Sequence, residues 1–309
     1  MIYTLTLNPS IDYLVQMDHF IPGITNRTID EMVDIGGKGI NVSCILAQLG
    51  LDTTALGFTA GFTGEEIERQ LQVKGIRTDM IRLKQGMSRI NIKLRDSVES
   101  EINVRGPWID SEDMERLMSK IMTLSDGDTL VMAGSVPGTA AEDTYEKILK
   151  ALKGKKLRIV VDTANQQLLN CLSYHPFLIK PNRQELSELF HTDVNSEQIT
   201  QQCARKLIEY GAENVLVSLG SDGAVLFAAD GKIYRSGVLK EPVLNAVGAG
   251  DSMVAGFIAG FEGTGDYAAA LRLGTACGNA TAFSRGLADY AKITDVLDRL
   301  PQCQLIGEI

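Results

Sequence analysis

The stretch from Asn245 to Ser252 contains the residues best suited to chemistry, because two glycines and an aspartate stand where an apolar helix is predicted to begin. The apolar residues that follow recur at helical spacing: Met253, Val254, Phe257, Ile258 and Phe261. The backbone N–H groups of Gly248, Ala249 and Gly250 are therefore expected at the positive end of a helix dipole, which binds anions. The same helix end is expected to keep Asp251 ionised, so that it can orient a hydroxyl group and accept its proton. This pattern favours phosphoryl transfer.

A simpler interpretation of the same stretch is a tight turn with Asp251 as a helix cap, since aspartate is a preferred N-cap residue. The stretch also fails two better known templates. It has no Lys-Ser/Thr ending of a Walker A loop, and Met253 stands where a dinucleotide-binding fingerprint requires a third glycine. Its function must therefore be judged from residues elsewhere in the chain.

A second glycine cluster, Gly36-Gly37-Lys38-Gly39, also precedes a predicted helix, which ends at Gly50. Lys38 offers a point charge to a phosphate, and Asn41 offers both a donor and an acceptor to a sugar hydroxyl. The alternative is a solvated lysine in a loop. Asp12, just after an opening strand from Ile2 to Leu7, argues against that alternative because it supplies a carboxylate acceptor for a polyol.

Four short apolar runs separated by helical patterns are predicted to be buried parallel strands: Thr129 to Ala133, Leu157 to Val161, Phe177 to Ile179 and Val215 to Leu219. Strands that alternate with helices indicate an α/β fold with a mostly parallel sheet. Polar residues follow each run, among them Ser135, Asp162, Lys180 and Ser218. Ligands bind at that edge of such sheets.

Two segments depart from this pattern, Arg27 to Ile35 and Ile90 to Val104. In the second, Ile90, Ile92 and Leu94 alternate with polar residues, which is typical of a half-exposed antiparallel sheet. We therefore expect a second, smaller sheet made of segments that are far apart in the sequence.

Composition and charge narrow the possible partners. The net charge of −9 argues against a nucleic-acid partner. Five scattered cysteines without metal-type spacing, Cys44, Cys171, Cys203, Cys277 and Cys303, favour reduced thiols and a cytoplasmic protein. The three histidines form no ligand pair, the chain begins directly with a strand, and no apolar run reaches membrane length. We expect neither a membrane association nor a histidine-based metal site.

Seven motifs together resemble the ribokinase-like superfamily of carbohydrate kinases, in the phosphofructokinase B branch and nearest to the bacterial 1-phosphofructokinases. The similarity runs from the first strand to the last helix, and the motifs are Thr6–Asp12, Gly36–Val42, Ser88–Lys93, Ala133–Pro137, Lys180–Glu185, Ser218–Gly220 and Gly248–Ser252. The resemblance implies one three-layer α/β/α domain over residues 1–309. It also implies a small antiparallel β lid from segments of about 11–35 and 87–107, and a homodimer formed through that lid.

The resemblance assigns roles to the transfer and nucleotide sites. Asp251 is the implied catalytic base, and the amides of Gly248, Ala249 and Gly250 are the implied anion hole. Asn182 is implied to bind the ATP phosphates, and Glu185 to hold Mg²⁺ through water. The other implied nucleotide contacts are Lys180, Ser218, Gly220, Gly223 and Asn279.

The implied acceptor site contains Asp12, Gly37, Asn41 and Ser135, with Lys38 and Arg89 for a phosphate already on the sugar. Unpaired cations in a closed site are costly, which favours a sugar phosphate over an unphosphorylated sugar. Arg27 is a further candidate from the lid, as a residue that could reach across a dimer. The role of Arg105 is open, and a solvated lid arginine is the simpler interpretation.

The resemblance implies MgATP-dependent phosphorylation of fructose 1-phosphate at its 6-hydroxyl, giving fructose 1,6-bisphosphate. Tagatose 6-phosphate and fructose 6-phosphate are the alternative acceptors within the same chemistry. A catalytically silent sugar-phosphate sensor is the alternative from another class. An intact Gly248 to Asp251 segment argues against the sensor, which needs no base at a transfer point.

Overall fold

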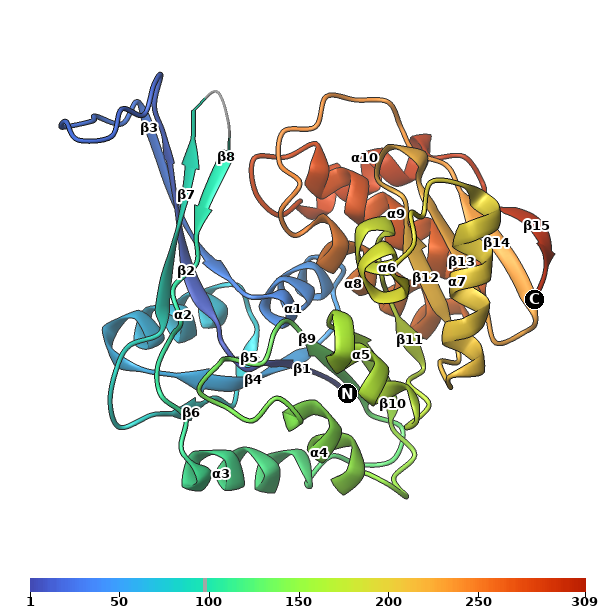
Figure 1. Cartoon of the computed structure of the whole chain (residues 1–309), viewed down its shortest axis with the longest axis horizontal. Coiled ribbons are helices and arrows are strands. Elements are labelled where there is room, and N and C mark those ends of the chain that lie inside the picture. The colour runs from blue at the N-terminus through green and yellow to red at the C-terminus, as the bar shows by residue number, and fades with distance from the viewer. Residues whose placement is uncertain (97–98) are drawn as a thin grey trace.

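A computed structural model, which describes residues 1–96 and 99–309, has a long central sheet and a separate small sheet (Figure 1). The strand order of the long sheet is β15-β14-β13-β12-β11-β10-β9-β1-β4-β5, with β6 also paired to β4. Pairing is parallel from β5 to β12 and antiparallel from β12 to β15. The expectation of a mostly parallel sheet is confirmed. The strands are β1 (Ile2–Thr6), β4 (Thr53–Thr59), β5 (Arg77–Thr78), β6 (Ile81–Arg82), β9 (Thr129–Ala133), β10 (Arg158–Asp162), β11 (Leu178–Ile179), β12 (Val215–Ser218), β13 (Ala224–Phe227), β14 (Lys232–Ser236) and β15 (Gln304–Glu308).

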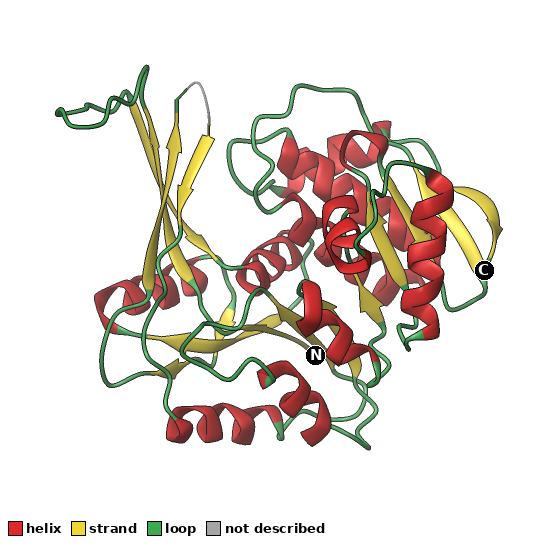
Figure 2. Cartoon of the chain, viewed as in Figure 1, coloured by secondary structure: helices red, strands yellow, loops and turns green. Residues whose placement is uncertain are grey.

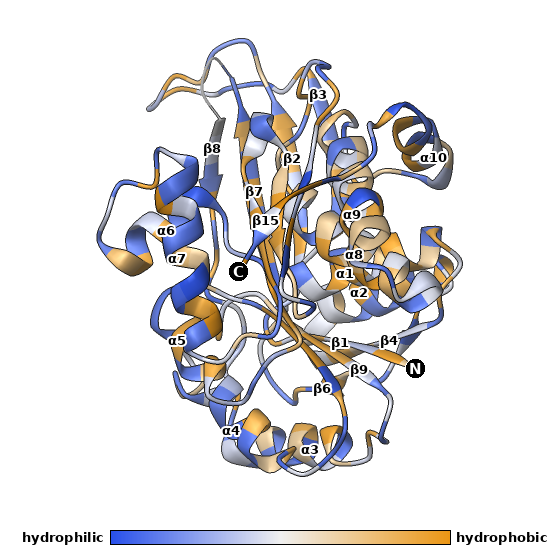
Figure 3. Ribbon diagram, turned by 90° about the vertical axis from the view of Figure 1, so that its right-hand side faces the viewer, coloured by the Kyte–Doolittle hydropathy of each residue, from blue (hydrophilic) through white to orange (hydrophobic). Residues whose placement is uncertain are grey.

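Helices cover both faces of this sheet (Figure 2). Successive side chains of a strand point to opposite faces, so that on β9 Leu130 and Met132 enter one core whereas Val131 and Ala133 enter the other. Helices α3 to α7 pack on the first face, and α1 and α8 to α10 on the second. The strands are largely hydrophobic, whereas α5 and α6 also carry hydrophilic residues (Figure 3). The helices are α1 (Lys38–Gln48), α2 (Gly61–Val73), α3 (Ser111–Ile121), α4 (Thr144–Ala151), α5 (Asn165–Leu172), α6 (Arg183–Phe190), α7 (Glu197–Glu209), α8 (Ala249–Thr264), α9 (Tyr267–Ala282) and α10 (Tyr290–Arg299).

The small sheet has the order β3-β2-β7-β8 and lies at the upper left of Figure 1, away from α8 to α10. Its strands are β2 (Ser10–Gln16), β3 (Asp30–Gly36), β7 (Arg89–Arg95) and β8 (Glu99–Ile102). The β2–β3 and β7–β8 pairs are antiparallel, but the central β2–β7 pair is parallel. The all-antiparallel sheet expected for these segments is therefore corrected to a mixed one. The parallel register sets Asp12 opposite Asn91.

The alternation along β7 has the opposite sense to that of an ordinary half-exposed strand. Asn91 and Lys93 are buried, whereas Ile90, Ile92 and Leu94 are only half-buried. The polar face of β7 is thus turned inward, which the alternation alone could not reveal because it fixes the two faces but not which one is covered.

Candidate active site

The helix start predicted at Gly248 is present, and its backbone geometry requires glycine. Gly248 is the residue before α8 and has φ +80°, in the left-handed region. A Cβ there would lie 2.7 Å from Cδ2 of Leu287, so a side chain would also collide with its neighbour. The Ala249 amide makes a long 3.4 Å bond to the Ala246 carbonyl. Within the described part of the chain, the Gly250 and Asp251 amides donate to no acceptor and remain available to an anion.

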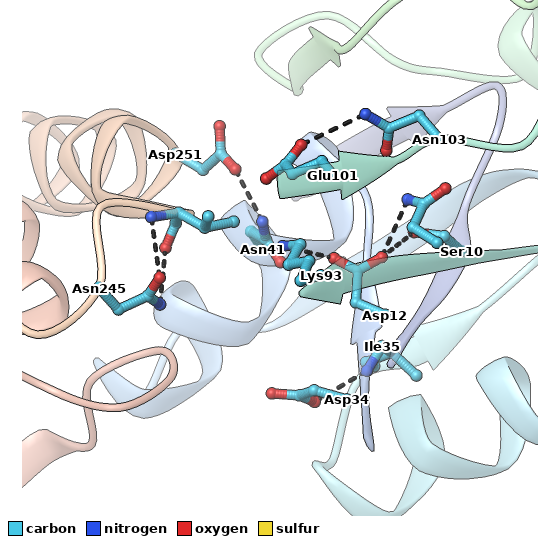
Figure 4. Close-up of polar contacts among 12 residues, drawn as sticks. Ser10, Asp12, Asp34, Ile35, Asn41, Lys93, Glu101, Asn103, Asn245 and Asp251 are labelled. Carbon is cyan, nitrogen blue, oxygen red and sulfur yellow. Dashed lines mark hydrogen bonds and ion pairs between the residues drawn. The ribbon is translucent and has the colours of Figure 1, made fainter. Parts of the chain in front are cut away.

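Asp251 points from α8 toward Asn41 (Figure 4). Its Oδ2 accepts a hydrogen bond of 2.8 Å from Nδ2 of Asn41, which lies on α1 and is 210 residues away in sequence. The structure therefore brings together the two residues that were predicted to act on the sugar hydroxyl. A carboxylate that is buried, fixed by one hydrogen bond and open on its other oxygen is suited to orient a hydroxyl group.

The ionisation of Asp251 differs from the sequence-based expectation. Burial raises the pKa of Asp251 to about 6, and the nearby Asp162 carboxylate adds to the rise, while Lys38, Asn41 and Lys180 act in the opposite direction. The helix end alone had predicted a carboxylate that stays ionised. The structure shows an opposing effect because the side chain is withdrawn from water.

This pKa predicts how turnover depends on pH. A base must be unprotonated to accept a proton, so kcat/KM, which follows ionisation in the free enzyme, is expected to be half-maximal near pH 6 and to fall roughly tenfold for each further pH unit. An assay of ADP release from pH 5 to 8.5, with circular dichroism to confirm folding at each pH, measures this. A flat profile down to pH 5 in a folded protein would contradict the assignment of Asp251 as the base.

A buried ion cluster lies beside Asp251. Asp162, at the end of β10, is 1% exposed, and its Oδ1 lies 3.4 Å from Nζ of Lys38 and 3.6 Å from Nζ of Lys180. Burial opposes the ionisation of Asp162, but the two lysines hold its pKa below its usual value. Asp162 in turn raises the pKa of Lys38, with smaller contributions from Asp251 and Glu185. Lys38 therefore stays charged between the predicted acceptor and transfer residues.

The sequence showed Asp162 only as a polar residue after a strand, and Lys180 was expected at the nucleotide. The structure shows that Lys180 is buried, packs under Gly250 and pairs with Asp162. Lys180 does not line the cavity of about 890 Å³ that Asn182 and Ser218 line. Its position supports the transfer point rather than the rest of the nucleotide.

One cavity of about 690 Å³ contains most of the predicted phosphate-binding residues. Gly37, Lys38, Arg89 and Ser135 line it, together with Asn8, Asn103 and the segment 163–167. Nε of Arg89 donates to the Asn8 carbonyl at 3.0 Å, and burial lowers the pKa of Arg89 below its usual value while Asp12 opposes the change. Among described atoms, Oδ1 of Asn8 is buried with no hydrogen-bond partner. Two cations and an unsatisfied polar atom are what a bound sugar phosphate would complete.

Asp12 and Asn41, which were predicted to bind the sugar, line a hollow of about 50 Å³ together with Lys93, Asn245 and other residues. Asp12 is held by Lys93 Nζ at 2.9 Å, by Asn91 Nδ2 at 3.0 Å and by Ser10 Oγ at 2.7 Å (Figure 4). Lys93 was part of a motif in the sequence but received no role there. The parallel register of β2 and β7 places it beside Asp12, and that register is not visible in the sequence.

Arg27, a candidate for the substrate, and Arg105, whose role was open, are both exposed. Arg27 lies in the loop between β2 and β3 and is not among the residues that line the cavity of about 690 Å³ or the hollow of about 50 Å³. Arg105 is exposed, and its carbonyl accepts a 2.8 Å hydrogen bond from Asn8. The exposure of Arg105 agrees with its interpretation as a solvated arginine.

A second large cavity, of about 890 Å³, lies on the other side of α8. Most of the predicted nucleotide contacts line it, together with Ala249 and Gly250 of the predicted anion hole: Asn182, Ser218, Gly220, Gly223 and Asn279. Its remaining wall includes Leu239, Val243, Met253 and Phe283, which suit the faces of a purine ring. Nδ2 of Asn279 is buried and, among described atoms, has no hydrogen-bond partner. Gly223 has φ +85° and a Cβ there would lie 2.3 Å from the Ser236 carbonyl oxygen, so this wall also requires glycine.

The orphaned amide of Asn279 leads to a prediction about the nucleotide cavity. Asn279→Ala is expected to raise the KM for ATP about five- to tenfold, because one hydrogen bond to the bound nucleotide is lost. The KM for the acceptor is expected to change less than twofold. Steady-state assays with either substrate varied measure both values, with the exposed Asn195→Ala as the matched control. An unchanged KM for ATP would remove Asn279 from the nucleotide site.

Asn182 and Glu185 form a capping box at the start of α6. Asn182 Oδ1 accepts from the Glu185 amide, and Glu185 Oε2 accepts from the Asn182 amide, both at 2.8 Å. Outside residues 97 and 98, no group of three or more His, Cys, Asp or Glu side chains is arranged to hold a metal ion. Mg²⁺ would therefore depend on nucleotide phosphates and waters, with Oε1 of Glu185 left to hold one water.

Comparison with known proteins identifies the family. A model of the pfkB family carbohydrate kinases matches residues 5–293. The chain belongs to this family. The kinase is 42% identical over 305 residues to a 1-phosphofructokinase of Bacillus subtilis, covering 99% of this chain and all of that one. It is 40% identical over 301 residues to a D-tagatose-1-phosphate kinase of Bacillus licheniformis, covering 97% and 98%.

A solved structure of phosphofructokinase-2 from Escherichia coli, in complex with substrates and products, has the same architecture. Its TM-score is 0.91 at 25% identity, covering 97% of this kinase and 99% of that chain. The ribokinase-like α/β fold expected from the motifs is thereby confirmed. Within residues 1–96 and 99–309, none of the helices of the kinase combines the length and hydrophobicity needed to cross a bilayer.

Proposed function

We propose that this kinase transfers the γ-phosphoryl group of MgATP to the 6-hydroxyl of D-fructose 1-phosphate, giving fructose 1,6-bisphosphate. The observation that carries the proposal is the position of Asp251. It lies at the start of α8, where Gly250 borders the nucleotide cavity, and its carboxylate is hydrogen-bonded to Asn41 of the acceptor hollow. The full-length similarity to a 1-phosphofructokinase supports fructose 1-phosphate as the acceptor.

The surroundings of each residue support a separate role in this transfer. Asp251 orients the acceptor hydroxyl and takes its proton, while the Gly250 and Asp251 amides face the charge on the transferred group. Arg89 holds the phosphate already on the sugar, and Lys38, fixed by Asp162, adds charge between the two sites. Mg²⁺, held through water by Glu185, would neutralise part of the phosphate charge. The transfer has a loose transition state, so positioning and electrostatics account for most of the rate.

A ketose 1-phosphate of the other C4 configuration is the second candidate acceptor. The similarity to a D-tagatose-1-phosphate kinase, at 40% identity over nearly the whole chain, favours including it beside tagatose 6-phosphate and fructose 6-phosphate. Fructose 1-phosphate and tagatose 1-phosphate carry the phosphate at the same end. Lys38 and Arg89, the cations that line the cavity of about 690 Å³, therefore suit both.

A coupled assay for ADP release, run with each of these sugar phosphates and with free fructose, tests the proposal. We expect the highest kcat/KM for fructose 1-phosphate, and NMR of the product is expected to show a new phosphate at carbon 6. A higher value for tagatose 1-phosphate would replace the acceptor but keep the chemistry. Release with none of them would support the sugar-phosphate sensor instead.

We also propose a homodimer formed through the small sheet, which is the lid in this proposal. Support comes from large apolar side chains exposed on its strands and loops: Phe20, Ile21, Ile24, Ile29, Val33, Ile102 and Val104. Sedimentation equilibrium is expected to give twice the 33.6 kDa mass of the chain.

We propose the cytoplasm as the compartment of the protein, because its scattered cysteines favour reduced thiols.

A further inference from the structure

One side-chain contact joins the small sheet to the loop that carries the anion-binding amides. Arg95, the last residue of β7, donates from Nη2 to Oδ1 of Asn245 at 3.2 Å, across 150 residues of sequence. Asn245 begins the segment 245–248, here called the anion loop, which leads directly into α8. The sheet that holds Asp12 and Arg89 thus contacts the loop that presents Gly248.

The Asn245 side chain also fixes the shape of the anion loop. Its Oδ1 accepts from the Val247 amide at 3.1 Å, and its Nδ2 donates to the Val247 carbonyl at 3.2 Å (Figure 4). The same Oδ1 therefore accepts hydrogen bonds from both the Val247 amide and the Arg95 guanidinium. A shift of the Arg95 guanidinium changes the position of an atom that is itself part of the loop.

The other supports of the loop come from the opposite side. The amides of Leu244 and Asn245 donate to the Ala282 carbonyl at the end of α9, at 2.8 and 3.2 Å. These bonds hold the entry to the loop against the helices, whereas Arg95 holds it toward the acceptor residues. The direction of the Gly250 and Asp251 amides depends on both, because Gly248, in a left-handed conformation, ends the loop and leads directly into α8.

A second contact, an ion pair, joins the small sheet to the segment after α9, and neither of its partners lies in the anion loop. Arg285, in the segment after α9, lies 3.4 Å from Asp30 at the start of β3, with side chains that are 82% and 52% exposed. It connects the same two parts of the molecule as Arg95 does. Arg285 is therefore a matched control for any effect of Arg95 that arises only from holding these parts together.

We infer that Arg95 and Asn245 are positioning residues, which hold the anion loop in register with the acceptor site so that the amides of α8 face the transferred phosphoryl group. The inference rests on the proposed function as far as it concerns turnover. Its structural part, that Arg95 restrains residues 245–251, stands independently of the substrate.

Hydrogen exchange measured by mass spectrometry tests the structural part on the unliganded full chain. Peptides covering residues 244–251 are expected to exchange at least threefold faster in Arg95→Ala than in the wild type, and at the wild-type rate in Arg285→Ala. Peptides from the core strand β9 are expected to be unchanged in both. Equal exchange of residues 244–251 in Arg95→Ala and wild type would overturn the inference, whichever sugar the kinase uses.

Kinetics test the positioning role. We expect Arg95→Ala to lower kcat about tenfold while both KM values stay within threefold, and Arg95→Lys to recover part of the loss. The double variant Arg95→Ala/Asn245→Ala is expected to be no slower than Asn245→Ala alone, because both changes remove the same contact. Multiplying effects, or a rise confined to the acceptor KM, would overturn the role. Failure of the wild type on every sugar phosphate would instead refute the proposed function, and the exchange result would still decide the inference.

Discussion

Asp251→Asn is expected to lower kcat about a thousandfold while the KM values for ATP and the acceptor change less than threefold. The amide keeps the size of the carboxylate and can still accept the hydrogen bond from Asn41, but it cannot take a proton. Removal of a base that acts only in the transition state lowers turnover and leaves ground-state binding in place. Steady-state kinetics with the ADP-release assay measure both. Turnover within about tenfold of wild type would exclude Asp251 as the base.

The same substitution has a predicted effect on stability, which serves as its control. Because the pKa of Asp251 is raised in the folded protein, its ionisation favours the unfolded chain, and the free energy of unfolding falls as the pH rises toward and through about 6. Asp251→Asn removes that ionisation. Its melting temperature is therefore expected to be equal to or above that of the wild type at pH 8, where the carboxylate is charged. A slow variant that is also less stable at pH 8 would indicate a damaged fold rather than a missing base.

Arg89→Ala is expected to lower kcat/KM for fructose 1-phosphate by about a hundred- to a thousandfold, mostly through KM. Arg89 lines the cavity of about 690 Å³ and is half-buried. Its Nε donates to the Asn8 carbonyl, which fixes the guanidinium so that its remaining N–H groups can bind one phosphate. Loss of two charge-assisted hydrogen bonds to a phosphate costs about 3–4 kcal/mol. Arg89→Lys is expected to recover part of this loss, because it keeps the charge but not the planar pair of donors.

Arg105→Ala is the matched control, since Arg105 follows β8 of the same small sheet but its side chain is exposed. It is expected to change kcat/KM less than twofold. With free fructose as the acceptor, the wild type and Arg89→Ala are expected to differ little, because no phosphate is present to be held. Equal losses for fructose and fructose 1-phosphate would mean that Arg89 supports the fold of the site rather than the substrate phosphate.

The two variants address different halves of one reaction. Asp251 acts on the hydroxyl that receives the phosphoryl group, and Arg89 acts on the phosphate at the other end of the sugar. A kcat effect for the first and a KM effect for the second would show that the acceptor lies between them. The reverse pattern would contradict this arrangement of the acceptor between Asp251 and Arg89.

Much of the fold could be predicted because its signals are local. The helix after Gly248, the helix ended by Gly50 and the four apolar runs all appear at the predicted places within one or two residues. Periodicity depends on neighbours a few positions apart, which the sequence displays directly. The antiparallel extension of the sheet by β13, β14 and β15 was not predicted. The hairpin of β13 and β14 around Asp230-Gly231 has a local signal that was missed. The pairing of β14 with β15, by contrast, joins distant segments and leaves no local pattern.

The candidate site was predicted only in part for the same reason. The motifs supplied Asp251, Asn41, Lys38 and Arg89, but not the partners that make them work. Asp162 beside two lysines, Lys93 on Asp12 and Arg95 on Asn245 are all contacts between distant segments. Lys180 and Arg27 were placed at ligands by their motifs or charge, whereas the structure puts one under Gly250 and the other in an exposed loop.

The sequence by itself determined which residue types are available for chemistry and where helices must begin, since glycine conformations and caps are properties of a few adjacent residues. Only the tertiary structure decided which of the residues meet and what charge they carry. The raised pKa of Asp251 illustrates the difference, because it depends on burial and on Asp162, which lies 89 positions earlier in the chain. Desolvation and Coulomb interactions act through space, so they become defined only once the chain has folded.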